Sequence, residues 1–115
     1  MTLIVGEPSY VDGMVAKIEA SIPETFALDQ NYPNPFNPIT RIAFSLPVPS
    51  HVNLSIYNVL GQKVITLEKG WMNTGNHQTI WNGRDAQGNA VSSGLYFYSL
   101  EADNFRQVKK MLFLK

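Results

Sequence analysis

The run Val52-Asn53-Leu54-Ser55-Ile56-Tyr57 alternates apolar side chains with polar or amphipathic ones at every second position. Because successive side chains of a β-strand point to opposite faces, this alternation predicts a strand with one buried face. The residues that follow, up to Gly61, predict a turn, in which glycine can adopt the positive φ that other residues disfavour. This part of the sequence therefore favours β-structure.

Period-two alternation recurs on both sides of this strand. Further strands are predicted at residues 42–46, 63–67, 77–81, 96–100 and 106–114, and turn formers separate them. Short strands spaced by turns are typical of an all-β fold, and we expect an antiparallel immunoglobulin-like β-sandwich of about seven strands. Since the chain has no cysteine, it lacks the disulfide of antibody domains, and Trp81 is the predicted central aromatic of the core.

The length and composition allow one domain and exclude several functions. A chain of 115 residues buries one core, and we expect the sandwich to occupy residues 26–115. Residues 1–25 read as a linker or as the remnant of a preceding domain. The net charge is zero, so nothing global attracts nucleic acid, and no apolar run approaches the ~18 residues of a membrane span. No signal peptide opens the chain, so we expect a longer natural protein with its export signal upstream.

Charge is distributed unevenly along the chain. The first thirty residues hold five acids and one lysine, a net of −4, whereas the last ten hold four bases and no acid, a net of +4. Such asymmetry indicates either an interacting tail or a solvated strand face.

The segment 82–89 is dense in turn formers and predicts a structured loop. Within it, Asp85, Gln87 and Asn89 have the spacing of the first three side-chain ligands of a calcium loop. Ala90 stands where such a loop needs glycine, and its twelfth position carries no acid. We therefore interpret the segment as a turn with side-chain-to-backbone hydrogen bonds and predict no metal there.

Nothing in the sequence points to catalysis. His51 and His77 stand apart from any predicted nucleophile, and Ser92-Ser93-Gly94 lacks the glycine-flanked pattern of a nucleophile elbow. No glycine-rich loop follows a strand and opens a helix, as a phosphate site would require. We predict no catalytic residue, no cofactor and no small-molecule substrate.

The last predicted strand is basic and then apolar. Its side chains fall on two faces, one with Lys109, Met111 and Phe113 and the other with Val108, Lys110, Leu112 and Leu114. From residue 111 onward both faces are apolar, which normally indicates a strand covered on both sides. In a small sandwich only one face meets the core, so we expect the upstream segment or a partner to cover the other. A last core strand with an apolar exterior is the alternative.

The run Asn31-Tyr32-Pro33-Asn34-Pro35-Phe36-Asn37-Pro38 holds three prolines in six positions. Proline fixes φ and favours extended geometry in the residue before it, so the run predicts a stiff lead-in. We expect Tyr32 and Phe36 to anchor this lead-in on the edge of the sandwich, and the prolines to block strand pairing there. A proline-rich ligand for the aromatic groove of a partner is the alternative interpretation.

These segments together resemble one known family. In chain order they hold Tyr32, Pro33, Asn34, Pro35 and Phe36 in the lead-in, then Gly61, then Trp81, Gly83, Asp85 and Gly88, and finally Ser93-Gly94-Leu95-Tyr96. Over roughly residues 26–115 the chain resembles the type A C-terminal sorting domain of proteins exported by the type IX secretion system. It departs from that family at Asn58 and Asn82, where the family usually carries aspartate.

The resemblance implies a non-catalytic bacterial protein-targeting domain that directs an upstream cargo across the outer membrane. The implied partners are the outer-membrane secretion machinery and its processing and attachment protease. The implied destination, after periplasmic transit, is the cell surface or the medium. The residues that the resemblance marks for partner recognition are Gly94, Tyr96, Lys109, Lys110, Met111, Leu112, Leu114 and Lys115. We expect a cut that removes the domain near residues 20–30, and an uncovered last strand can also pair with a second copy.

Two alternatives from other classes stay open. The segment 81–100 also resembles the immunoglobulin-like domain of flagellar hook-capping proteins, which is structural. The second alternative is a carbohydrate-binding sandwich of a secreted enzyme. It needs exposed aromatic side chains on one flat face, for which the candidates are Tyr57, Trp71 and Phe97.

Overall fold

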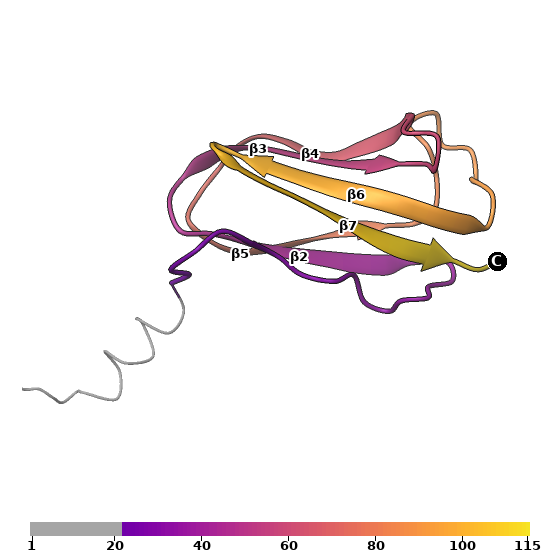
Figure 1. Cartoon of the computed structure of the whole chain (residues 1–115), viewed down its shortest axis with the longest axis horizontal. Helices are drawn as coiled ribbons and strands as arrows, with labels where there is room; N and C mark the ends of the chain where they lie inside the picture. Colours follow the sequence, from indigo (N-terminus) through magenta and orange to yellow (C-terminus); the bar gives the residue numbers. More distant parts are fainter. Residues whose placement is uncertain (1–21) are drawn as a thin grey trace, which may run out of the picture.

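The chain folds into two antiparallel sheets whose inner faces share one core (Figure 1). The computed structural model describes residues 22–115, which contain seven strands and no helix. One sheet has the strand order β1-β2-β5 and the other the order β4-β3-β6-β7. The strands are β1 Ala27–Leu28, β2 Thr40–Leu46, β3 Ser50–Tyr57, β4 Lys63–Met72, β5 Gly75–Trp81, β6 Gly94–Ala102 and β7 Phe105–Phe113. The predicted all-β sandwich is confirmed.

Most strands form where the alternation predicts them, but β4 is longer. It continues past residue 67, the predicted end, to Met72. The sequence does not show this extension because its half-buried positions include Glu68 and Gly70, whereas the large apolar side chain of Trp71 is exposed. β1 was not predicted, because a strand of two residues is too short to show an alternation of apolar and polar residues.

The core lies between the sheets and is largely aliphatic and aromatic. Trp81, at the end of β5, is 1% exposed, which confirms the predicted central aromatic. Its ring packs edge-on against Tyr96, with ring centroids 5.3 Å apart, and its indole N–H donates to the carbonyl oxygen of Arg84 at 2.9 Å. The polar group of this large side chain is therefore satisfied by the loop that follows β5.

The two ends of the sandwich carry different loops. The chain enters the described part at the end that holds the turns after β2, β4 and β6. The opposite end holds the turn 58–62, the long loop 82–93 and Lys115 (Figure 1). The first described residues and the end of β7 thus lie at opposite ends of the sandwich.

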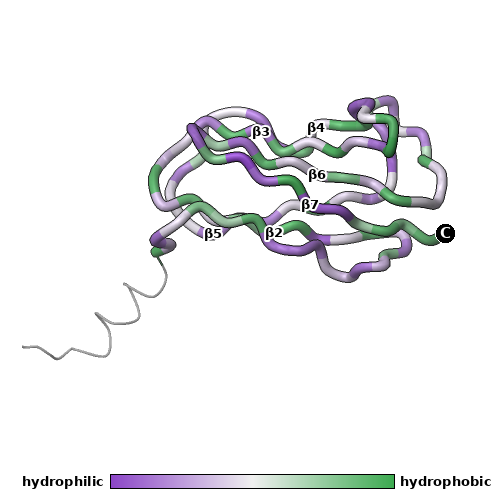
Figure 2. The backbone as a smooth tube through the Cα atoms, viewed as in Figure 1, coloured by the Kyte–Doolittle hydropathy of each residue, from purple (hydrophilic) through white to green (hydrophobic). Residues whose placement is uncertain are grey.

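Hydropathy changes sharply along β7. Figure 2 shows a hydrophilic stretch in the middle of β7 and a hydrophobic stretch that runs to the C-terminus. Within residues 22–115, no helix is long and apolar enough to cross a membrane. The first 21 residues, and with them most of the expected linker 1–25, lie outside the described residues.

Candidate functional site

The proline-rich lead-in, residues 30–38, joins the edges of the two sheets. Tyr32 and Arg41 of β2 exchange two backbone hydrogen bonds of 2.9 and 2.8 Å. Phe36 donates to the carbonyl of Leu112 and accepts from the N–H of Leu114, both at 3.0 Å, and lies parallel to β7. The expectation that the prolines prevent pairing here is wrong. The lead-in N–H groups that pair belong to Tyr32 and Phe36, so the missing proline donors are not needed.

The two aromatic residues of the lead-in behave differently. The Phe36 side chain is 1% exposed and stacks on Phe113, with ring centroids 4.8 Å apart. The ring of Tyr32 is 72% exposed, so only its backbone holds the lead-in. The predicted aromatic anchor is therefore correct for Phe36 and wrong for Tyr32.

A buried polar network, which the sequence did not reveal, fixes the start of the lead-in. Asn31 is 2% exposed, and its side-chain amide donates to the Thr40 hydroxyl at 2.9 Å and to the Pro33 carbonyl at 3.1 Å. Its backbone N–H donates at 2.8 Å to the Tyr98 hydroxyl, which donates in turn to the carbonyl of Asp29 at 2.7 Å. Because each of these buried donors finds an acceptor, the hydrogen bonds of the network offset the desolvation cost of burying its polar groups.

Burial dominates the acid–base behaviour of this network. Loss of hydration disfavours the phenolate and raises the pKa of Tyr98 to about 12, and the charge of Asp29 adds to the rise. The hydrogen bond from Asn31 opposes it. The hydroxyl therefore stays protonated at neutral pH and keeps donating to Asp29.

β7 presents two faces, as the alternation predicted. Met111 and Phe113 point inward and are 1% and 3% exposed, whereas Lys110, Leu112 and Leu114 are exposed. The lead-in reaches the outer edge of β7 but does not cover its outer face, on which Leu112 remains 36% exposed. Among the described residues, the apolar exterior near the end of β7 is thus accessible.

The remaining residues marked for recognition divide between surface and core. Tyr96 is 6% exposed, and its hydroxyl donates to the carbonyl of Ser92 at 2.6 Å, while burial raises its pKa. Gly94 has a φ of +147° and lies opposite Phe113 in the register of β6 and β7. The N–H of Lys115 donates to the Ser93 hydroxyl at 3.0 Å. The exposed members of the set are therefore Lys110, Leu112, Leu114 and Lys115, with Lys109 half-buried.

Gly83, in the loop after β5, is required by close packing. A Cβ on Gly83 would lie 2.9 Å from the Cζ atom of Phe113, which is closer than real Cβ contacts. Gly83 also has a φ of +72°. The Trp81–Gly83 motif and the end of β7 are thus a single packed unit.

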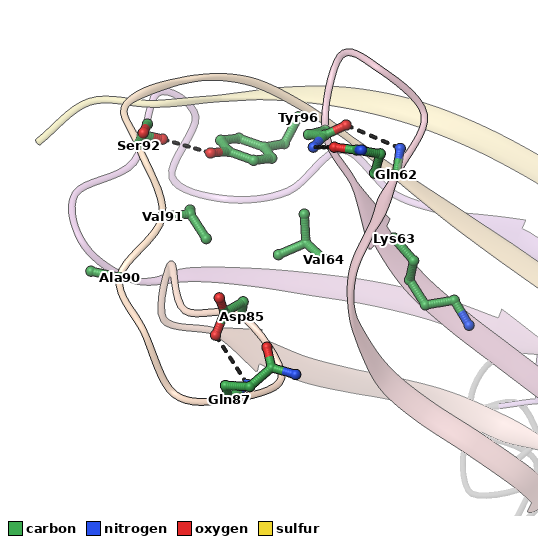
Figure 3. A pocket seen from close by; sticks show the side chains of 10 residues that line it. Gln62, Lys63, Val64, Asp85, Gln87, Ala90, Val91, Ser92 and Tyr96 are labelled. Carbon is green, nitrogen blue, oxygen red and sulfur yellow. Dashed lines mark hydrogen bonds between the residues drawn. The ribbon is translucent and has the colours of Figure 1, made fainter.

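A polar hollow of about 550 Å³ lies beside this unit, between the turn 58–62 and the loop 82–93 (Figure 3). One carboxylate oxygen of Asp85 accepts from the N–H groups of Gln87 and Asn89 at 3.0 and 2.9 Å, as predicted for a turn. The side chain of Asn58 likewise accepts from two N–H groups of its own turn. Among residues 22–115, no three His, Cys, Asp or Glu side chains gather as metal ligands would.

The three aromatic residues proposed for carbohydrate binding do not share one site. Tyr57 and Phe97 are direct cross-strand partners on the outer face of the larger sheet. Trp71 lies opposite His51 at the other end of β3, six residues or about 20 Å away along the strand, and packs edge-on against that histidine. A flat platform of three aromatic rings is therefore absent from these positions.

Comparison with protein families gives one match over most of the chain. The model of the secretion system C-terminal sorting domain matches residues 30–114. No curated protein matches at a significant level.

Comparison with solved structures finds the same fold in several proteins. PorU from Porphyromonas gingivalis, described as dimeric and latent, matches at 17% identity with a TM-score of 0.61, over 80% of this chain and 10% of that one. PorZ from the same organism, described as a surface component of its type IX secretion system, matches at 20% identity with a TM-score of 0.51, over 84% and 12%. FlgD from Xanthomonas campestris, described in terms of flagellar hook capping, matches at 20% identity with a TM-score of 0.53, over 86% and 73%.

At identities of 17–20%, these similarities to solved structures establish the fold alone. The chain spans about a tenth of the PorU and PorZ structures, so it is similar to one domain of each.

Proposed function

Because this chain belongs to the secretion system C-terminal sorting domain family, we propose that it directs a cargo protein fused upstream across the outer membrane through a type IX system. The match over residues 30–114 supports this function, and domains of that family are not catalytic. The cargo would then reach the cell surface or the medium.

We propose that the secretion machinery recognises the end of β7. Inward-pointing Met111 and Phe113 fix this strand in the core, and the lead-in holds its edge. The exposed side chains Lys110, Leu112, Leu114 and Lys115 are thereby presented on a rigid support. Apolar side chains that enter pockets, flanked by lysines that meet acidic groups, combine affinity with orientation.

The geometry of the chain supports the same assignment. Residue 22 lies at one end of the sandwich and Lys115 at the other (Figure 1). A cargo domain upstream of residue 22 would therefore leave the recognised end free. A cut near residues 20–30, by a processing and attachment protease, would release the cargo.

A secretion assay tests the proposal. The 115-residue chain is fused behind a reporter with an inner-membrane export signal, in a bacterium that has a type IX system. We expect the reporter on the surface. Substituting both Leu112→Ser and Leu114→Ser should hold it in the periplasm, because these exposed side chains are lost while the core stays intact.

Ile80→Ser is the matched control, since Ile80 is 60% exposed on the other sheet. The proposal fails if the unaltered fusion stays in the periplasm, and the structural role named for FlgD then becomes the better account. If the Ile80→Ser fusion also stays in the periplasm, the loss of export is not specific to the end of β7, and the assignment of recognition to that end fails.

A further inference from the structure

The outer edge of β7 is only partly covered. In an antiparallel pair, successive residues direct their backbone groups alternately toward the partner strand and away from it. The N–H and C=O of Leu112 and the N–H of Leu114 point away from β6, toward the lead-in. Since the pairing of β6 and β7 has no register shift, Arg106, Val108 and Lys110 also direct their backbone groups outward.

The lead-in covers the second half of this edge. Leu112 binds Asn34 and Phe36, Leu114 binds Phe36, and the carbonyl of Lys110 accepts from the side chain of Gln30 at 2.8 Å. These groups are therefore not available to a partner.

The first half of the edge is open. Among the described residues, no hydrogen bond reaches the outward N–H and C=O of Arg106 and Val108 or the N–H of Lys110. In Figure 1, β7 and the lead-in diverge toward the beginning of β7. The open backbone groups of residues 106–110 define what we call the open stretch. Unpaired backbone groups on an edge strand are a template for a further strand.

Side chains around the open stretch define the chemistry of what can pair there. Arg106, Val108 and Lys110 share the outer face, and Val108 is 50% exposed. A shallow hollow of about 350 Å³ lies beside them, lined by Gln30, Phe97, Val108, Lys109 and Lys110. Glu101 of β6 is the direct cross-strand partner of Arg106, and its carboxylate lies 3.6 Å from the guanidinium group. The open stretch is thus basic at both ends and apolar between them.

This charge pattern disfavours a second copy as the occupant. A twofold axis at Val108 would use every open backbone group, but it would set Arg106 of one copy directly opposite Lys110 of the other. Like charges directly opposite on neighbouring strands are destabilising. A strand with acidic side chains opposite Arg106 and Lys110 makes both contacts attractive.

We propose that the open stretch of β7 accepts an extended acidic segment of a partner protein, which adds to the larger sheet as a fifth strand. The segment carries the alternating pattern acidic–any–apolar–any–acidic. Its acids face Arg106 and Lys110, and its apolar side chain packs on Val108 beside Phe97. This inference rests on the proposed function and adds a backbone contact next to the exposed side chains at the end of β7.

Binding of a capped Glu-Thr-Val-Thr-Glu peptide to the 115-residue chain tests it, with Lys-Thr-Val-Thr-Lys as the matched peptide. We expect binding of the acidic peptide alone, with the N–H groups of Arg106, Val108 and Lys110 becoming protected from hydrogen exchange. Val108→Pro removes an outward N–H without breaking a bond to β6, and should weaken binding roughly tenfold. Val108→Thr keeps that N–H and should change affinity by less than about threefold.

A charge exchange gives an independent measurement. Arg106→Glu together with Lys110→Glu should reverse the preference, so that the lysine peptide binds instead. Absence of binding to the unaltered chain, equal binding by Val108→Pro, or an unchanged preference in the double variant would each overturn the inference. If the Val108→Pro fusion is still sorted to the surface, pairing on the open stretch is not the recognition step, although the sorting function stands. If the unaltered fusion is not sorted, it is the sorting function that fails.

Discussion

Gly83→Ala is the substitution whose cost follows most directly from the structure. The added Cβ would lie 2.9 Å from Cζ of Phe113, whose ring is 3% exposed and is held against Phe36. Overpacking of this kind typically costs about 1–3 kcal/mol. The φ of +72° adds a cost of about 1–2 kcal/mol for any residue with a Cβ. We expect the free energy of unfolding to fall by about 2–5 kcal/mol.

Gly88→Ala separates the two contributions. Gly88 has a similar φ of +86°, but nothing lies within 4 Å of an added Cβ. Only the backbone cost of about 1–2 kcal/mol should remain. The difference between the two variants is therefore the contact with Phe113.

Urea unfolding followed by tryptophan fluorescence measures both variants, since Trp81 lies beside Phe113 in the core. The midpoint should shift further for Gly83→Ala than for Gly88→Ala, at an unchanged slope. Phe113→Leu removes ring atoms that meet the new Cβ, so it should cost less in the Gly83→Ala background than alone. Equal midpoints for the two glycine variants would refute the argument that β7 is locked by close packing on the loop.

Three further outcomes are expected. Tyr98→Phe removes the acceptor of the buried Asn31 N–H and the donor to the Asp29 carbonyl. It should lower the free energy of unfolding by about 1–3 kcal/mol, measured by thermal unfolding. An unchanged midpoint would mean that water replaces the hydroxyl. The raised pKa of Tyr98 should make the unaltered chain lose stability as pH rises from 10 toward about 12, because the unfolded chain releases this proton first; the fall should be smaller in Tyr98→Phe, and equal slopes would contradict the shift. Phe36→Ala empties a core position and should cost about 3–5 kcal/mol, with faster hydrogen exchange at Leu112, whereas slow exchange there would show that the lead-in is held without its ring.

Periodicity predicted the fold because most strands have one buried face. Val52, Leu54 and Ile56 are each 3% exposed or less, so the alternation of apolar residues in β3 correctly predicts its buried face. The end of β4 was missed because its half-buried positions include Glu68 and Gly70, while the apolar Trp71 is exposed. Apolar periodicity cannot locate such a segment, because the backbone hydrogen bonds that hold it in the sheet form whatever its side chains are.

The candidate site was predictable in part. The two faces of β7 follow from the alternation of Lys110, Met111 and Leu112. The sequence could not reveal that the lead-in occupies half of the outer edge, because Phe36 and Leu112 are far apart in the chain. The role of Asn31 was hidden for the same reason, since its buried partner Tyr98 lies 67 residues away.

The parallel course of the lead-in along β7 has a mechanical consequence. The chain enters the described part at one end of the sandwich and reaches Lys115 at the other, so traction on both ends pulls the lead-in and β7 in opposite directions. The bonds of Phe36 and Asn34 to β7 would then share the load in shear, instead of opening one after another as in a peeled hairpin. The rate of forced unfolding is set by the barrier and not by equilibrium stability. Stretching the domain between its two ends would therefore have to break these bonds together.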